Sequence, residues 1–418
     1  MNLSQTFAEM EARRAMPKPR QHINDTIAAF YVAITTMIMA YGSLFGAYPI
    51  LLLYAIWLPK FRPFTLSKDT LILLPLPLLA VASALWSDYP LDSIYYALEY
   101  ASLILCTIII SETVSTRAFM RGIIIGCTIV LAIALVSNHY GGDGFSGNDA
   151  LMGYFGSKNM VGLFAEIGLL FSLLQLFAAP KKILLLLIPL SISAISLYLS
   201  KSASSVLSLA LTLAVMTLLY LITKSPRSYR LFMLIGSILI IAALAFAAWS
   251  ADWQQFLFKS VGKESTLTGR TALWERGIHI GMEKPLLGHG YSAFWIAGNP
   301  RAEQIWFDHG VLNKTGFHFH NLYIELFVEL GIAGVAIMIA FLLINVSKCI
   351  GSALHRGINI TSALPLAIAL MFVIRSLVEV DLIGTFNIGT VLCYSIIPRL
   401  AGSKTAVPPL IPAAGKMR

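Results

Sequence analysis

Long apolar runs separated by short polar gaps cover most of the chain. A helix needs roughly 20 apolar residues to cross a bilayer, so each run is a candidate span. The runs are continuously apolar, whereas the strands of a membrane β-barrel alternate apolar and polar residues. The pattern therefore predicts an all-α polytopic membrane protein with about 12 transmembrane helices. The expected spans are 25–43, 45–59, 70–86, 92–111, 118–137, 159–178, 183–199, 204–223, 231–249, 319–346, 359–378 and 382–398.

The composition supports a membrane protein. Of the 418 residues, 57% are hydrophobic and 12% are charged, whereas soluble domains carry about 25% charged residues. These figures exclude a water-soluble globular enzyme and a disordered chain. The net charge of +9 then reflects the bias of basic residues towards cytoplasmic loops, and we expect no nucleic-acid partner.

The positions of the basic residues predict the topology. If the first 23 residues lie inside, the inside gaps hold 20 of the 30 Lys and Arg residues, and the short outside gaps hold three. The remaining seven lie in a long outside segment, 250–318. They are not counted in the topology prediction, because long loops do not obey the charge rule. We therefore expect one membrane domain over 1–418, with the N-terminal segment 1–23 and the tail 400–418 in the cytoplasm.

Polar residues at membrane depth are expensive and mark candidate sites. The first cluster lies in the long outside segment, where Thr268 and Gly269 resemble a helix start and Arg270 follows in the first turn. Arg270 and Trp274 are four residues apart and share a helix face; Arg276 is a further candidate for substrate binding. The alternative is a helix lying on the membrane with Trp274 as an interfacial anchor.

The second cluster lies where the long segment re-enters the membrane. His318 and His320 are two residues apart, and Asn321, Glu325 and Glu329 recur every four residues along one helix face. Two carboxylates at this depth predict cationic partners. A metal site formed by His318, His320 and Glu325, or a polar cap that fixes the loop to the bundle, is the alternative.

The third cluster comprises three outer-end fragments. Lys158 and Asn159 begin the sixth span, and Lys201 lies in the turn between the seventh and eighth spans. Arg375 and Glu379 are spaced to pair on one helix. Glu379 and Asp381 also resemble a carboxylate pair for a metal–diphosphate complex, although acidic residues at helix ends are common. The candidate substrate-binding residues are Lys158, Asn159, Lys201, Arg276, His318, Asn321, Glu329, Arg375 and Glu379.

One hypothesis joins the clusters. Lys158, Lys201 and Arg270 would meet in a cavity that opens to the outer leaflet and would hold a diphosphate, whose negative charge grows as it leaves a sugar. A histidine beside them could take the proton of an attacking hydroxyl at neutral pH. Binding alone would need the cations but no base, and here both are present.

Several motifs resemble the O-antigen ligase and Wzy-type polymerase superfamily, most closely its ExoQ-like exopolysaccharide polymerases. Each motif is weak alone, but their order, with a long loop before H-x-H-N, is fairly specific. The motifs separate polymerase from ligase poorly. They are SALWSDYPLDSI at 83–94, FGSKNMVG at 155–162, LSKSASSVLSL at 199–209, TGRTALW at 268–274, PLLGHGYSAFW at 285–295 and HFHNLYIELFVELGIAG at 318–334.

The resemblance implies a GT-C-like membrane glycosyltransferase with one large periplasmic loop before span 10. Such an enzyme uses undecaprenyl-diphosphate-linked saccharides at the periplasmic side of the bacterial inner membrane, without nucleotide sugar, cofactor or metal. His320 matches the family's proposed base and Arg270 the diphosphate arginine; Glu325 or Asn321 would orient the histidine. A chain-length regulator and a flippase are the partners that the family suggests.

The turn SKSASS departs from the ligases, which typically have an arginine there, whereas this chain has Ala203 and Ser204, with Lys201 nearby. This departure favours a polymerase of repeat units. A ligase that adds a finished glycan to lipid A core or to protein is the first alternative. A transporter or flippase of lipid-linked sugars is the second, although a transporter should line its path with polar groups through the full depth of the bilayer.

Overall fold

In a computed structural model of the protein, seven helices in the described part of the chain are long and apolar enough to cross a membrane. The structure describes residues 23–60, 71–142, 149–226, 228–229, 232–233, 266–311, 314 and 317–402. The seven helices are α2 (Asp25–Tyr41, continued by η1, Gly42–Phe45), α6 (Pro90–Thr113), α7 (Thr116–Ser137), α8 (Lys158–Ala178), α9 (Ile183–Ser200, preceded by η5, Pro180–Lys182), α10 (Ala203–Lys224) and α15 (Leu322–Arg356). The prediction of a polytopic helical membrane protein is thus confirmed.

The number of spans stays a prediction. Four of the twelve expected spans correspond to shorter helical elements, and the expected span 231–249 lies almost wholly outside the described residues. The shorter helical elements are α3 (Tyr48–Trp57, extended by η2, Leu58–Lys60), α5 (Pro75–Ala82, extended by η3, Ser83–Leu85), α16 (Ile360–Arg375), and the pair α17 (Ile388–Tyr394) and α18 (Ile396–Gly402).

Three details differ from the expected boundaries. The helix α15 continues to Arg356, ten residues beyond the expected end at 346. The last span begins later than expected, because residues 376–387 form a loop and the Asn387 side chain caps α17 by accepting from the backbone N–H of Gly389. A short antiparallel pair, β1 (Tyr140–Gly142) and β2 (Asp149–Leu151), is the departure from an all-α chain.

Small residues bring the membrane helices close together. On α7, a Cβ at Gly122 would lie 2.5 Å from the Cβ of Val32, and one at Gly126 would lie 2.5 Å from that of Thr36, both on α2. Lipid tails are as apolar as leucine, so close backbone approach of this kind supplies much of the attraction between membrane helices.

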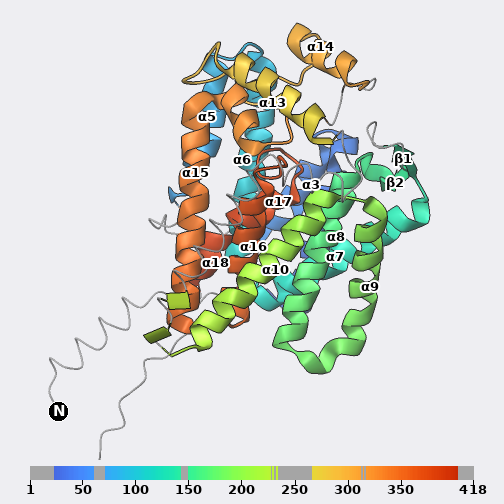
Figure 1. Ribbon diagram of the computed structural model, residues 1–418, viewed down its shortest axis with the longest axis vertical. Helices are drawn as coiled ribbons and strands as arrows, with labels where there is room; N and C mark the ends of the chain where they lie inside the picture. The colour runs from blue at the N-terminus through green and yellow to red at the C-terminus, as the bar shows by residue number, and fades with distance from the viewer. Residues whose placement is uncertain are drawn as a thin grey trace, which may run out of the picture.

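The long loop before α15 contributes a second, smaller core at one end of the bundle, where α13 (Thr266–Gly281) and α14 (Pro300–Asp308) lie at the top of Figure 1. Its buried members include Leu273 of α13, Ile305 and Trp306 of α14, and Phe294 and Phe319 from the connecting segments. This core packs α13 against the beginning of α15, so part of the loop is folded onto the membrane helices.

The α15 helix is interrupted at Gly331, whose φ of 64° and ψ of −163° are not helical. The segment 285–290 fills the gap. The backbone N–H groups of His289 and Gly290 donate to the carbonyls of Val328 and Glu329 at 2.9 Å each, and Ile332 donates to the carbonyl of Pro285 at 2.8 Å. The loop thereby satisfies the backbone groups that the break would leave unpaired.

Candidate active site

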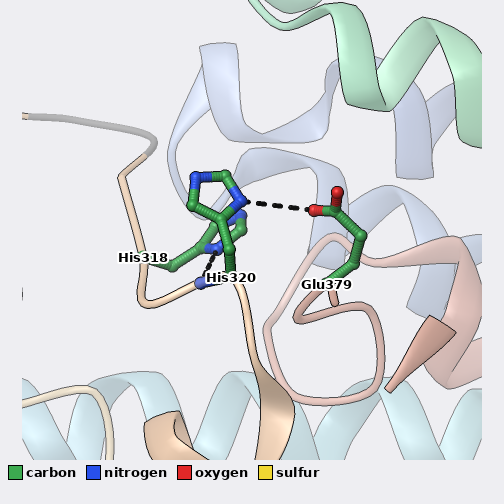
Figure 2. Close-up of side chains that lie close together, drawn as sticks. All are labelled: His318, His320 and Glu379. Atoms are coloured by element: carbon green, nitrogen blue, oxygen red, sulfur yellow. Dashed lines mark hydrogen bonds and ion pairs between the residues drawn. The ribbon is translucent and has the colours of Figure 1, made fainter. Parts of the chain in front are cut away.

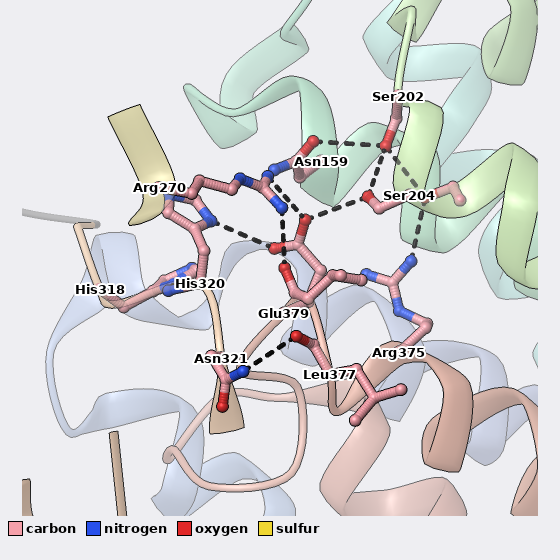
Figure 3. A network of polar contacts seen from close by, with 12 residues as sticks. Asn159, Ser202, Ser204, Arg270, His318, His320, Asn321, Arg375, Leu377 and Glu379 are labelled. Carbon is pink, nitrogen blue, oxygen red and sulfur yellow. Dashed lines mark hydrogen bonds and ion pairs between the residues drawn. The ribbon is translucent and has the colours of Figure 1, made fainter. Parts of the chain in front are cut away.

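Five segments meet at the end of the bundle that carries α13. They are the first half of α13, residues 317–321 before α15, the loop 376–387 after α16, the start of α8, and the turn between α9 and α10. Figure 3 shows that their polar side chains form one network around Glu379. Residues far apart in the chain therefore converge around Glu379.

His320 lies at the tip of the segment before α15. Its backbone has a φ of 50°, a left-handed conformation that is uncommon for a residue other than glycine. Its backbone N–H donates to Nδ1 of His318 at 3.1 Å, and its own Nδ1 lies 3.4 Å from a carboxylate oxygen of Glu379 (Figure 2). The side chain is 23% exposed. The first bond fixes the backbone of His320, and the contact with Glu379 orients the ring and leaves Nε2 as the nitrogen that a ligand can approach.

The Glu379 carboxylate is 3% exposed and is the centre of the network. One oxygen faces His320; the other accepts from the Ser204 hydroxyl at 3.0 Å and lies 3.5 Å from the Arg270 guanidinium. Burial alone would raise the pKa of Glu379. The hydrogen bond from His320 and the positive charges of His320 and Arg375 outweigh burial and lower that pKa from 4.5 to about 2. Glu379 is therefore a carboxylate at neutral pH.

His318 supports this arrangement as a neutral acceptor. Burial, followed by the neighbouring charge of His320, lowers the pKa of His318 from 6.5 to about 3. The rings of His318 and His320 lie 4.2 Å apart. His318 is therefore neutral and accepts the backbone N–H of His320.

Arg270 lies on α13 with its side chain 27% exposed. Its Nη1 donates to the backbone carbonyl of Val378 at 3.2 Å, beside its contact with Glu379. One turn further on, the Trp274 indole donates to the carbonyl of Phe319 at 2.8 Å. The shared face of Arg270 and Trp274 thus holds the two loops of the site together, since both side chains bond to loop backbone.

The turn between α9 and α10 contributes hydroxyl groups. Ser202 lies 3.3 Å from the Asn159 side-chain oxygen and 3.2 Å from the Ser204 hydroxyl, which reaches Glu379. Lys158, the first residue of α8, is half-buried beside Asn159. Lys201 caps the end of α9 in a left-handed conformation and is exposed; within the described part of the chain no side-chain hydrogen bond or ion pair joins it to Glu379.

Arg375 is 1% exposed and lies beneath the network, contrary to a direct role in substrate binding. It donates to Glu166 at 2.9 Å, to Ser205 at 3.0 Å and to Asp381 at 2.5 Å. The expected side-chain pair with Glu379 is therefore replaced by pairs with Glu166 and Asp381. Because a buried arginine is stable only when its charge is matched, this cluster holds the loop 376–387 in place.

The carboxylates of the polar stripe on α15 accept hydrogen bonds from neutral donors, so the prediction of cationic partners is wrong. Glu325 accepts from the Phe319 backbone at 2.8 Å and from the Trp295 indole at 2.7 Å. Asn321 caps α15 and donates to the carbonyl of Leu377 at 3.0 Å. Neither side chain bonds to the ring of His320; that position belongs to Glu379. Glu325 holds the segment 318–320 in place by accepting the backbone N–H of Phe319.

Two further residues lie outside the network. Glu329 is buried next to Glu325, where it accepts from the backbone of Ser292. Arg276 pairs with Asp308 of α14 at 2.5 Å, with both side chains partly exposed. These contacts explain how the loop is held on α15 and do not place either residue beside His320.

The sequence hypothesis missed three contributors: the hydroxyls of Ser202 and Ser204 and the carbonyl of Val378. In the sequence, Ser204 was visible only as part of a serine-rich turn that departs from the ligase pattern. Counting spans does not show that this turn lies beside Glu379.

A metal site has to be weighed at this position. His318, His320 and Glu379 each offer one ligand atom, and these atoms lie within 4.8 Å of one another. Glu379 replaces Glu325 in the ligand set considered from the sequence, because Glu325 is occupied by Trp295 and Phe319. The Arg270 guanidinium already lies against Glu379 and opposes a second cation there. The geometry favours a histidine–carboxylate pair.

Comparisons with known proteins cover part of this site. A family model described as O-Antigen ligase matches residues 188–339, which include α13 and the His318–His320 segment. The resemblance predicted from the motifs is confirmed. The chain is also 29% identical over 383 residues to the exopolysaccharide production protein ExoQ of Rhizobium meliloti (strain 1021), covering 90% of this chain and 88% of the relative.

Proposed function

We propose that the protein polymerises undecaprenyl-diphosphate-linked oligosaccharide repeat units by inverting glycosyl transfer at the periplasmic face of the bacterial inner membrane. The observation that carries the proposal is the convergence of Arg270, His320 and Glu379 from three separate segments. The similarity to an exopolysaccharide production protein over 90% of the chain supports a polymer-forming role.

In the proposed reaction, His320 is the general base. Glu379 accepts from Nδ1 and so leaves Nε2 unprotonated and directed at the acceptor. The acceptor hydroxyl gives its proton to Nε2, and its oxygen attacks the anomeric carbon of the donor. The bond between that carbon and the diphosphate oxygen breaks, and undecaprenyl diphosphate leaves with the electron pair. Glu379 then stabilises the imidazolium that has formed.

The cations would stabilise the leaving group. Arg270 is 27% exposed and, among the described residues, bonds to a backbone carbonyl and, at 3.5 Å, to Glu379, so its planar fork can turn to two diphosphate oxygens. Lys158 lies at the N-terminus of α8, where the helix dipole adds to its charge. Lys201 is exposed and is proposed as a more distant contact for the donor.

The test is a reconstituted reaction. The purified protein in liposomes receives a lipid-diphosphate-linked repeat unit, and the glycan products are separated on a gel. A ladder of regularly spaced bands, lost with His320→Ala, supports the polymerase. A single shifted band that requires a separate lipid A core or protein acceptor means a ligase, which the family match favours. Movement of the lipid-linked unit between leaflets without a new glycan overturns the enzyme proposal.

The same assay tests the expectation that no metal takes part. Treatment with a chelator should leave the rate unchanged, because the proposed base and the diphosphate ligands are protein side chains. A rate that falls with the chelator and returns with one divalent metal would instead assign His318, His320 and Glu379 to that metal.

A further inference from the structure

An apolar cavity of about 550 Å³ lies between α2, η1 and the start of α3. Ile34, Ile38 and Tyr41 of α2 form one wall, and Phe45 and Leu52 line the other side. The hydroxyl of Tyr41 donates to the backbone carbonyl of Val130 at 3.2 Å and is already satisfied. A cavity of this size and lining takes an apolar ligand.

The cavity adjoins two segments that build the polar site. The Tyr41 ring stacks on Phe155 with centroids 5.4 Å apart, and Phe155 lies three residues before Lys158. At Gly42, a Cβ would lie 2.5 Å from the ring of Phe386, which belongs to the same loop as Glu379. The cavity wall is therefore in contact with the segment that leads to Lys158, a proposed diphosphate ligand, and with the loop that carries Glu379.

The rim of the cavity is also apolar. Phe45 is 63% exposed, and Leu52 is 48% exposed. On a protein with several membrane-spanning helices, large apolar side chains exposed at the ends of helices face hydrocarbon more favourably than water. A chain that lies in the bilayer can therefore enter the cavity without first crossing water.

We propose that this cavity binds the isoprene units next to the diphosphate of the donor lipid. The identity of the occupant rests on the proposed function, whereas the cavity and its contacts do not. The hydrocarbon chain of a donor held by Lys158 would begin near Phe155, whose ring stacks on the cavity residue Tyr41. Continuity with the head-group site favours this chain over an acyl chain of a bulk phospholipid.

The binding test uses the full chain in lipid nanodiscs and a polyprenyl diphosphate, without sugar, that carries a photoreactive group in its second or third isoprene unit. Crosslinks are expected within residues 34–52. Leu52→Trp places an indole in the cavity and should reduce crosslinking about tenfold, the effect of losing a few buried methylene contacts. Leu51→Trp is the matched control, since Leu51 is 62% exposed beside the cavity and is not among its lining residues.

A kinetic test uses saccharide donors with increasing numbers of isoprene units. The wild type and Leu51→Trp should gain kcat/KM with chain length until the cavity is filled, and Leu52→Trp should lose this gain. Equal chain-length dependence in both variants would overturn the proposal. In the crosslinking test, a phospholipid that competes with the probe as well as an unlabelled polyprenyl diphosphate does would also overturn it. Crosslinks to another segment with transfer intact overturn the cavity assignment alone. Crosslinks to 34–52 without any transfer support the cavity and refute the glycosyltransferase.

Discussion

Two clusters in this protein contain the same three kinds of side chain, a histidine, a carboxylate and a cation, yet they differ in how fully the histidine is bound. In the first, His289 places Nδ1 2.7 Å from Asp88 and Nε2 3.1 Å from the carbonyl of Ile280, while Lys284 lies 2.5 Å from Asp88. In the second, His320 and Arg270 lie 3.4 and 3.5 Å from Glu379.

The closed cluster is structural. Both ring nitrogens of His289 face oxygen acceptors, and the side chain is 3% exposed. Burial alone would raise the pKa of Asp88, but the hydrogen bonds from Lys284 and His289 lower it below its usual value. His289 belongs to the segment that fills the break in α15, so the cluster fastens the loop to the bundle.

The open cluster retains unused bonding capacity. His320 has one ring nitrogen held by Glu379 and is 23% exposed, in a backbone conformation that costs energy. The comparison teaches that residue type does not distinguish a reactive histidine from a structural one. What distinguishes them is whether the fold has left a nitrogen accessible.

The largest expected effect comes from exchanging each histidine for alanine. His320→Ala should lower kcat by roughly 10² to 10⁴, the usual contribution of a general base, with the smaller of the two losses in melting temperature. His289→Ala should do the reverse, since it leaves a buried carbonyl unpaired at a cost of about 1–3 kcal/mol. Activity per folded molecule and thermal melting in detergent measure both. Similar losses of activity in the two variants would remove the distinction between the clusters.

The carboxylates provide the second comparison. Glu379→Gln removes the charge that stabilises the protonated histidine and should lower kcat roughly 10²-fold, whereas Asp88→Asn should lower the melting temperature.

The pH dependence of stability gives a further test of Glu379. The folded pKa of Glu379, about 2, lies below its ordinary 4.5. Its ionised form therefore stabilises the protein fully above about pH 4.5 and progressively less as pH falls towards 2. The melting difference between wild type and Glu379→Gln should be constant from pH 8 to 5 and shrink below; a difference that grows on acidification contradicts the assignment.

A third test disturbs the segment 285–290, which carries His289 of the closed cluster, without changing either histidine. A Cβ at Gly331 would lie 2.4 Å from the backbone of Leu286, at a φ of 64°. Gly331→Ala should therefore cost at least about 2 kcal/mol in the free energy of unfolding. Gly351→Ala, in the same helix and with nothing within 4 Å of its Cβ, should be neutral or slightly stabilising. Equal melting temperatures would show that the segment 285–290 does not depend on the break.

The smallest expected effect distinguishes the cations. Arg270→Lys keeps the charge and loses the planar fork, so the KM for the donor should rise about tenfold. Lys284→Arg keeps the charge in a partly exposed pair that contributes about 1 kcal/mol or less, and should change neither KM nor melting noticeably. An Arg270→Lys variant with unchanged KM would exclude bidentate binding of the diphosphate by Arg270.

Much of the site could be predicted as a set of segments. The clustering of Arg270, His318–His320 and Glu379 at outer span ends was visible in the sequence, because charged residues are rare in apolar runs. The pairing could not be predicted. Glu325 follows His320 by five residues and was the nearest acidic candidate, but it bonds to Trp295 and Phe319, while Glu379, fifty-nine residues away, reaches the ring.

The sequence by itself determined the class of the protein, the approximate positions of the helices in the described residues, and the candidate residues, because these follow from local hydrophobicity and from the cost of burying charge. The tertiary structure alone decided that α15 breaks at Gly331 to accept the segment 285–290, that Arg375 lies beneath the site, and that an apolar cavity adjoins it. These features depend on which backbones come close in space. Spacing along one chain cannot specify contacts between segments whose approach depends on how the whole bundle packs.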